Sequence, residues 1–209
     1  MRYRLAIFDF DGTLADSFGV FVRVFNECAA RYGIRRIEEH AIRELRGMGG
    51  RAIQAKLGIA AWKTPFIARE MRRRMHDRVQ EVRLFPGIPD VLKRLSDSGI
   101  TLAVVTSNSE QNVRAVLGPE LAGRIGHYAC GAALLGKARR FTQVLRRSAL
   151  PAAQAIAVGD EIRDSEAAAV AGIDFGAVTW GYTLPEALAA QSPRITFERV
   201  EDLLELGLP

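Results

Sequence analysis

The sequence predicts an α/β fold, with a parallel sheet as the core and an all-helical segment inserted after the first strand. Near the N-terminus, a continuous apolar run over residues 5–8 precedes two carboxylates, and buried parallel strands have such runs. Residues 16–82 then show helical spacing and no strand pattern. From residue 85 onward, apolar strand segments alternate with helical ones, which indicates a parallel sheet with right-handed crossovers.

The inserted segment is expected to begin with a helix that Asp16 or Ser17 caps and Gly33 ends. A long helix should close it, with Thr64 as the N-cap and Pro65 in the first turn. Two shorter helices should lie between them, on either side of a glycine-rich loop. The helices predicted in this segment cover residues 17–32, 38–45, 51–57 and 64–82.

The second part of the chain begins where Phe85-Pro86-Gly87 breaks the last of these helices. Short apolar runs then predict strands over residues 100–106, 127–130, 155–159 and 175–179, and the last of these is expected to be the final strand of the core. Helical patterns that end at glycines or apolar strand starts fill the remainder. These helices are expected over residues 89–96, 110–117, 137–147, 162–171, 184–190 and 199–206.

This order predicts two domains. Residues 1–15 and 84–209 would form a Rossmann-like core, and residues 16–83 would form a separate unit, which we call the helical insertion. The hinges between them would lie near residues 14–17 and 82–87.

The composition of the 209-residue chain restricts the class of protein. With 48% hydrophobic residues it can bury a sizeable core, yet no apolar run reaches the roughly 18 residues of a membrane span. The chain leads from Met1 directly into the first strand, so we expect no signal peptide and a cytoplasmic protein. Cys28 and Cys130 are expected to be small buried residues rather than a bridge or a metal pair.

A net charge of +5 favours anionic partners such as phosphorylated metabolites. The densest basic cluster, around residues 69–78, is interleaved with acidic residues and is interpreted as a solvated helix face. No nucleic-acid motif or aromatic stacking platform accompanies it, so we expect no nucleic-acid partner.

Polar residues follow three of the predicted strands. Asp9 and Asp11 end the first strand and would share one face of it. Thr106 follows the second strand, and Asp160, with Asp164 four residues on, follows the strand over residues 155–159. Open α/β sheets place their ligands at these carboxyl ends.

These segments resemble the motifs of the haloacid dehalogenase superfamily. The first motif is matched by DFDGTL at residues 9–14, the second by the strand end VVTSN at 104–108, and the fourth by GDEIRD at 159–164. Lys137 stands where the third motif has its lysine. The helical insertion, the tail VTWGY at 178–182 and Asp16-Ser17 resemble members similar to phosphoglycolate phosphatase.

Three clustered carboxylates would repel one another unless a hard cation such as Mg²⁺ bound them. The resemblance implies that Asp9, Asp160, Asp164 and the backbone carbonyl of Asp11 bind Mg²⁺. It also implies that Asp9 is a nucleophile that forms an aspartyl phosphate and that Asp11 is a general acid and base. The phosphoryl group of the substrate would contact Thr106, Ser107, Asn108 and Lys137.

The predicted function is Mg²⁺-dependent hydrolysis of a small phosphomonoester, phosphoglycolate-like or a sugar phosphate. Arg46 or Arg51, which flank the loop over residues 47–50, would read an anionic part of the substrate. Exposed arginines at helix ends are an equally good interpretation. Trp62 and Phe66 are expected in the core of the helical insertion.

Several alternatives stay open. Thr106 and Ser107 could cap a helix, Lys137 could be a surface residue, and Glu161 and Arg163 could be site supports or an exposed pair. A β-phosphoglucomutase-like phosphomutase is the second candidate, although residues 14–25 lack the histidine of those enzymes. A third is a non-catalytic anion-binding or nucleic-acid-binding protein. The chain could be a monomer or a homodimer.

Overall fold

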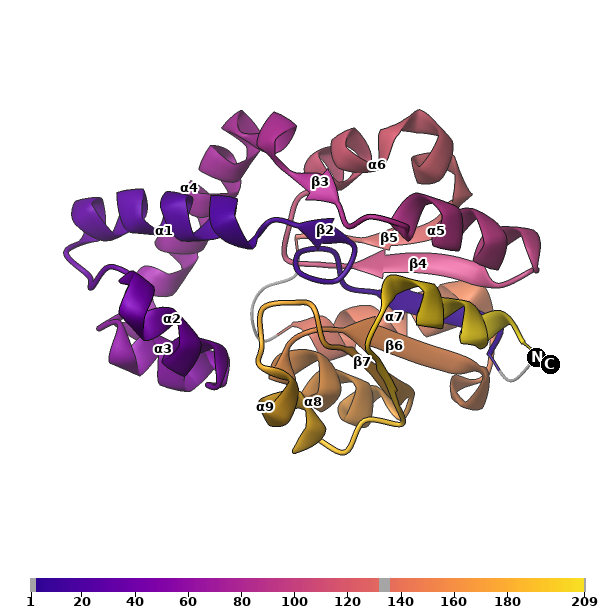
Figure 1. Cartoon of the computed structure of the whole chain (residues 1–209). Coiled ribbons are helices and arrows are strands. Elements are labelled where there is room, and N and C mark those ends of the chain that lie inside the picture. Colours follow the sequence, from indigo (N-terminus) through magenta and orange to yellow (C-terminus); the bar gives the residue numbers. More distant parts are fainter. Residues whose placement is uncertain (1–2, 132–135, 209) are drawn as a thin grey trace.

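The computed structural model of the chain describes residues 3–131 and 136–208. Met1 and Arg2, where the sequence predicts a direct lead into the first strand, lie outside the described residues. A parallel six-stranded sheet confirms the predicted fold class (Figure 1). In sheet order the strands are β5 (Ile125–Ala129), β4 (Thr101–Val105), β1 (Leu5–Phe8), β6 (Ala155–Gly159), β7 (Asp174–Val178) and β8 (Ile195–Phe197).

The first strand lies at the centre of this sheet, and its four residues are buried. Ala6 and Phe8 pack into one hydrophobic cluster, whereas Leu5 and Ile7 pack into another. Because side chains alternate along a strand, the two clusters lie on opposite faces of the sheet. A strand covered on both faces must be apolar at every position, which explains the continuous apolar run in the sequence.

Helices of the core cover both faces (Figure 1). The cluster around Phe8 includes residues of the first two helices of the core, and the cluster around Ile7 includes residues of the next two. In chain order the helices are α5 (Ile88–Asp97), α6 (Glu110–Arg124), α7 (Lys137–Ser148), α8 (Ile162–Ala171) and α9 (Pro185–Ala189), with 3₁₀ segments η4 (Ala152–Gln154) and η5 (Val200–Gly207).

The helical insertion lies beside the sheet (Figure 1). It has a small hydrophobic cluster of its own, which includes Phe25, Leu45 and Leu57. Its helices are α1 (Phe18–Tyr32), α2 (Ile42–Arg46), α3 (Gly50–Lys56) and α4 (Thr64–Asp77), with single 3₁₀ turns η1 (Glu39–Ala41), η2 (Ala61–Lys63) and η3 (Val79–Glu81).

The observed secondary structure differs from the prediction in five places. The helical insertion was expected to lack strands, but a short antiparallel pair joins its two ends. The pair consists of β2 (Ala15–Asp16) and β3 (Arg83–Leu84). The long helix expected to reach residue 82 ends at Asp77, and α6 continues through a kink at Gly118 to Arg124. The strand expected to be the last, β7, is followed in the sheet by β8. The terminal helix is of the 3₁₀ type.

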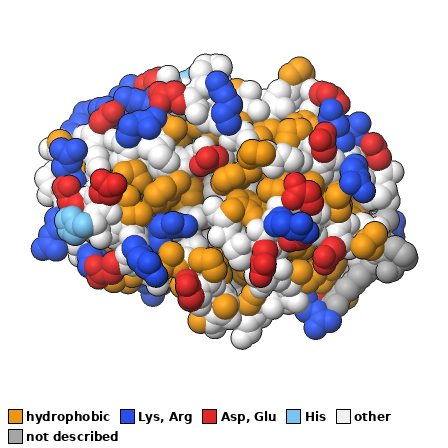
Figure 2. Space-filling model, in the orientation of Figure 1, with side chains coloured by type: hydrophobic (Ala, Val, Ile, Leu, Met, Phe, Trp, Pro, Cys, Tyr) orange, Lys and Arg blue, Asp and Glu red, His pale blue; other side chains and the backbone are white. Residues whose placement is uncertain are grey.

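Two exposed aromatic residues contradict another prediction. Trp62 and Phe66 are 70% and 59% exposed and therefore do not form the core of the helical insertion. The basic cluster on α4 is paired with acid, since Arg73 and Arg74 both contact Glu70. Over the face shown in Figure 2, basic and acidic side chains are likewise interspersed.

Both cysteines are free, Cys28 buried and Cys130 half-buried. Among the residues that the structure describes, no helix is long and apolar enough to cross a membrane.

Candidate active site

Three buried carboxylates meet at the carboxyl edge of the sheet. Asp9 follows β1, Asp160 follows the neighbouring strand β6, and Asp164 lies in the first turn of α8. One carboxylate oxygen from each lies within 4.8 Å of the others. The structure thus brings together the three acidic residues that the sequence singled out from two distant segments.

Asp160 is held on both of its oxygens. Thr13 Oγ1 donates to Oδ1 at 2.6 Å, and the backbone N–H of Tyr182 donates to Oδ2 at 2.7 Å. Two glycines make room for this side chain, because a Cβ at Gly12 would lie 2.3 Å from Asp160 Oδ2 and a Cβ at Gly181 would lie 2.2 Å from Asp160 Cβ. Gly12 also has a φ of +82°, which favours glycine.

Lys137 lies within the carboxylate cluster and is buried, so it is not a surface lysine. As the first residue of α7, it places Nζ 2.5 Å from Asp164 Oδ1 and 2.7 Å from Asp9 Oδ2. Burial lowers the pKa of Lys137, but the charges of Asp164 and Asp9 outweigh burial and raise it above its usual value. The ammonium group therefore stays charged.

One ammonium group does not neutralise this cluster. Burial, the charge of Glu161 and then that of Asp9 raise the pKa of Asp160 well above its usual range. Burial likewise raises the pKa of Asp164 to about 6, although Lys137 opposes the change. Asp9 Oδ2 is buried and lies against Lys137 Nζ, but no donor among the described residues meets it in hydrogen-bond geometry.

The donor set fits a hard divalent cation, because it consists of buried carboxylate oxygens with excess negative charge. Beside the cluster, Arg163 pairs with Glu161 at 2.5 Å, and both side chains are about one-quarter exposed. Glu161 is also the N-cap of α8, where its backbone N–H donates to Asp164 Oδ2 at 3.1 Å.

Asp11 has an environment of its own. Ser17 Oγ donates to Asp11 Oδ1 at 2.8 Å, and Asn108 Nδ2 donates to Asp11 Oδ2 at 3.0 Å. Burial raises the pKa of Asp11 to about 6, the charge of Asp9 adds to the increase, and these two hydrogen bonds oppose it. A carboxyl group with a pKa near 6 can both give and take a proton near neutral pH.

The segment after β4 contributes differently at each position. Thr106 is buried, and its Oγ1 accepts from the backbone N–H of Asn108 at 3.1 Å, which leaves the hydroxyl proton available. The Asn108 amide donates to Asp11 instead of facing open space. Ser107 is half-buried, and its predicted contact with a phosphoryl group stays a prediction.

The two predicted substrate arginines differ. Arg46 Nε and Nη2 donate to the carbonyls of Tyr182 and Gly181, both at 2.9 Å, so this residue ties α2 to the loop that supports Asp160. Arg51 is exposed in the first turn of α3. Neither residue is close in sequence to the carboxylates, and their predicted contact with substrate stays a prediction.

The sequence interpretation missed several supporting residues. Thr13 and Tyr182 lie inside motifs that were recognised, so their place in those motifs is the signal that could have found them. Asn112 and His76 carry no such signal, yet Asn112 Nδ2 donates to Asn108 Oδ1 at 2.9 Å and His76 Nδ1 lies 2.6 Å from Asn112 Oδ1.

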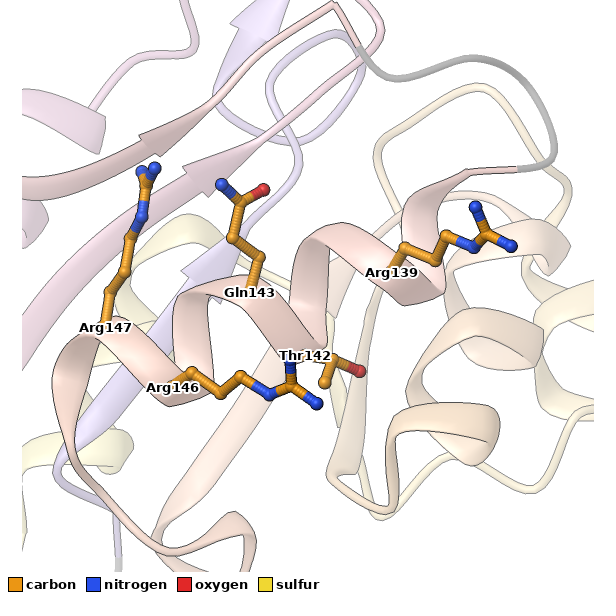
Figure 3. A pocket seen from close by; sticks show the side chains of 5 residues that line it. All are labelled: Arg139, Thr142, Gln143, Arg146 and Arg147. Carbon is orange, nitrogen blue, oxygen red and sulfur yellow. The ribbon is translucent and has the colours of Figure 1, made fainter.

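Two open pockets lie outside the carboxylate cluster. One, of about 420 Å³, lies on the outer face of α7, where the side chains of Arg139 and Arg146 extend away from the helix (Figure 3). Lys137 and Phe141 occupy the opposite, buried face. The other, of about 500 Å³, lies between α2 and the segment before α9 and is lined in part by Arg46 and Leu184.

The fold and this site define the class of protein. The family of haloacid dehalogenase-like hydrolases matches residues 6–178, and the chain belongs to that family. Its structure resembles that of a haloacid dehalogenase-like family protein from Streptococcus pneumoniae, with a TM-score of 0.80 and 23% identity over 98% of both chains.

Similarity to individual proteins indicates the subgroup of this family to which the chain is related. The chain is 34% identical to the phosphoglycolate phosphatase of Synechococcus elongatus over 95% of this chain and 94% of that protein. It also resembles the crystal structure of CbbY from Rhodobacter sphaeroides in complex with phosphate, with 27% identity, a TM-score of 0.74, and coverage of 98% of this chain and 96% of that one. The chain is thus a phosphoglycolate phosphatase-like member of the family and a phosphoric monoester hydrolase.

Proposed function

We propose that this phosphatase uses Mg²⁺ to hydrolyse a small phosphomonoester through an aspartyl phosphate on Asp9. The observation that carries the proposal is the buried cluster of Asp9, Asp160 and Asp164, whose oxygens lie within 4.8 Å of one another. Such a cluster is costly to bury without a cation, and a small set of carboxylates that leaves room for substrate phosphate suits Mg²⁺.

Asp9, Asp160, Asp164 and the backbone carbonyl of Asp11 would hold the ion. When bound, Mg²⁺ would offset the charge of a phosphate and act as a Lewis acid toward it. Lys137, which contacts both Asp9 and Asp164, would hold the Asp9 carboxylate in place and add positive charge where the phosphoryl group arrives.

The reaction would proceed in two displacements at phosphorus. In the first, an Asp9 carboxylate oxygen forms a bond to phosphorus while the bond to the leaving oxygen breaks, and Asp11 gives that oxygen its proton. In the second, Asp11 takes a proton from water, the water oxygen bonds to phosphorus, and the acyl phosphate bond breaks. Inorganic phosphate leaves, and Asp9 is again a carboxylate.

Residues 16–83 would act as a cap over this site. Two connections join them to the core, and β2 and β3, which pair within these connections, lie next to the loop that carries Asp11. A cap excludes water and selects the substrate. The full-length similarity to a phosphoglycolate phosphatase supports phosphoglycolate or a comparably small phosphomonoester.

The test is phosphate release from a panel of phosphomonoesters, measured with Mg²⁺ or with EDTA, for wild type and Asp9→Asn. The panel includes phosphoglycolate, N-acetylmuramic acid 6-phosphate, sugar phosphates, nucleotides and p-nitrophenyl phosphate. Asp77→Asn, on the surface of α4, is a matched control that removes a carboxylate outside the site.

Turnover that requires Mg²⁺, vanishes in Asp9→Asn and persists in Asp77→Asn would support the proposal and rank the substrates. Equal turnover in wild type and Asp9→Asn would exclude Asp9 as the nucleophile. Folded protein without turnover on any substrate would favour a phosphomutase or a binding protein.

A further inference from the structure

A chain of side-chain hydrogen bonds runs from the helical insertion to Asp11. His76, in the last turn of α4, lies with Nδ1 2.6 Å from Asn112 Oδ1 on α6. Asn112 is buried, whereas the imidazole of His76 is exposed. This contact joins the helical insertion to the core at a place separate from the paired strands β2 and β3.

The contacts fix the direction of every hydrogen bond in this chain. Asn112 Nδ2 donates to Asn108 Oδ1 at 2.9 Å, so the side of Asn112 that faces His76 is its oxygen. An oxygen can only accept, and His76 Nδ1 must therefore carry a proton. Asn108 Nδ2 in turn donates to Asp11 Oδ2 at 3.0 Å.

Backbone groups support the same orientation. The backbone N–H of Ser109 donates to Asn108 Oδ1 at 2.9 Å, and that of Asn112 donates to Ser109 Oγ at 3.2 Å. Rotation of the Asn108 amide by half a turn would place its Nδ2 against the Ser109 N–H, which is a second donor. The same rotation of Asn112 would place its oxygen against Asn108 Oδ1, which is a second acceptor. The amides therefore have one good arrangement, and His76 completes it.

The second oxygen of Asp11 is held without His76. Ser17 Oγ donates its only proton to Asp11 Oδ1 at 2.8 Å. Tyr182 Oη, 2.9 Å from Ser17 Oγ, must then be the donor in that contact. Asp11 is thus fixed at Oδ1 by the connection into the helical insertion and at Oδ2 by the chain that ends at His76.

We propose that His76 and Asn112 are positioning residues, which hold the Asp11 carboxyl group in its working orientation when α4 lies against α6. The proposal rests on the acid–base role proposed for Asp11. The part-buried contact between His76 and Asn112 is the hydrogen bond of this series that joins the helical insertion to the core. Separation of α4 from α6 breaks that contact and leaves Asn112 Oδ1 without its donor, which weakens the support that Asn112 gives to Asn108 and thereby to Asp11 Oδ2.

Substitution at His76 tests this chain without disturbing the core. His76→Phe keeps a ring but removes the donor, and His76→Asn restores an N–H donor near the position of Nδ1. His40→Phe, at another exposed histidine of the helical insertion, is the matched control. The assay is steady-state turnover of a substrate that wild type hydrolyses with Mg²⁺.

We expect His76→Phe to lower kcat about 3- to 10-fold with KM changed less than about twofold, because orientation of the acid–base residue affects the reacting state more than binding. His76→Asn should recover most of kcat, and His40→Phe should match wild type. An unchanged kcat in His76→Phe, or an equal loss in His40→Phe, would overturn the proposal.

A double-mutant cycle distinguishes an effect of His76 that passes through Asn108 from a general structural effect. In an Asn108→Ala background the chain is already broken, so adding His76→Phe should lower kcat no further. If His76→Phe lowers kcat by the same factor in both backgrounds, His76 does not act through Asn108 and the proposal is refuted.

A measurement independent of activity distinguishes failure of this proposal from failure of the proposed function. Nitrogen-15 NMR of the imidazole should show neutral His76 protonated at Nδ1, and Asn112→Ser should shift the proton toward Nε2. A neutral His76 protonated at Nε2 in wild type would refute the proposed series of hydrogen bonds from His76 to Asp11, even in an active enzyme. An inactive wild type with His76 Nδ1 protonated would count against the proposed function and not against the series of hydrogen bonds.

Discussion

Gly159 lets the side chain of Asp164 lie directly against the end of β6. A Cβ at this position would lie 2.2 Å from Asp164 Oδ2 and 2.7 Å from Asp164 Cγ. Gly159→Ala should therefore displace Asp164, weaken Mg²⁺ binding at least tenfold and lower the free energy of unfolding by about 1–3 kcal/mol. Calorimetric titration with Mg²⁺ and thermal melting would measure both effects.

Gly123→Ala is the control for this prediction. Gly123 lies in α6, its φ is ordinary, and no atom would come within 4 Å of an added Cβ. Alanine is a better helix former than glycine, so this variant should be as stable as wild type or more so, by up to about 1 kcal/mol. Similar losses in both variants would point to a general intolerance of alanine rather than to the contact with Asp164.

The raised pKa of Asp11 predicts a specific pH dependence of stability in metal-free protein. A carboxyl group whose pKa rises from 3.8 to about 6 on folding binds protons more tightly in the folded state. The free energy of unfolding therefore falls as pH rises from about 4 to about 6. At pH 7 the buried Asp11 carboxylate lowers it by about 3 kcal/mol. Asp11→Asn removes this dependence.

Denaturant unfolding of both proteins between pH 4 and pH 7 would measure it. The stability of Asp11→Asn minus that of wild type should increase by about 2 kcal/mol over this range. The lost hydrogen-bond geometry in the variant adds an offset that does not change with pH. Parallel curves for the two proteins would contradict the prediction.

At the scale of residues, sequence order limits what could be predicted. Asp9 and Asp160 were found because each directly follows an apolar strand, and parallel strands bring such positions to one edge of the sheet. His76 and Asn112 come from helices of two different units, and their meeting depends on how α4 lies on α6. No local pattern contains that information.

At the scale of elements, periodicity predicted most helices and strands of the core. The two-residue strands β2 and β3 are too short to show an alternating pattern, which explains why they were missed. The helix that was expected over residues 110–117 resumes after Gly118, a single residue with a φ of +72°. Trp62 and Phe66 show that apolar character alone does not decide burial.

Arg46 joins two elements, since it links α2 to the loop that supplies the Tyr182 N–H to Asp160. Arg46→Ala should weaken Mg²⁺ binding several-fold and lower the free energy of unfolding by about 1–3 kcal/mol, because two charge-assisted hydrogen bonds are lost. Arg51→Ala, at an exposed position, should change neither quantity. Calorimetric Mg²⁺ titration and denaturant unfolding would measure the two effects.

The same pair of variants tests the substrate hypothesis. If Arg46 contacts substrate rather than supporting the loop, Arg46→Ala would raise KM and leave Mg²⁺ affinity unchanged. A rise in KM for Arg51→Ala would assign the substrate contact to Arg51. The two outcomes differ in which constant changes, so one set of titrations and rate measurements separates them.

At the scale of the whole molecule, the buried carboxylate cluster lowers the free energy of unfolding of the metal-free protein. Burial raises the pKa of Asp160 well above its usual range, so the ionised cluster destabilises the metal-free protein near neutral pH. A cation that binds only the folded state reverses this effect. At a concentration 100 times its dissociation constant, Mg²⁺ should add about 2.7 kcal/mol, or about 5–10 °C in Tm for a chain of this size.

Asp160→Asn should separate the two contributions. Removing the buried charge should raise the Tm of the metal-free protein above that of metal-free wild type, and the same change should abolish the increase produced by Mg²⁺. Thermal melting of both proteins with EDTA or with Mg²⁺, at matched ionic strength, would measure it. An equal increase with Mg²⁺ in both proteins would mean that the ion stabilises the fold elsewhere, since the variant lacks one of the three clustered carboxylates.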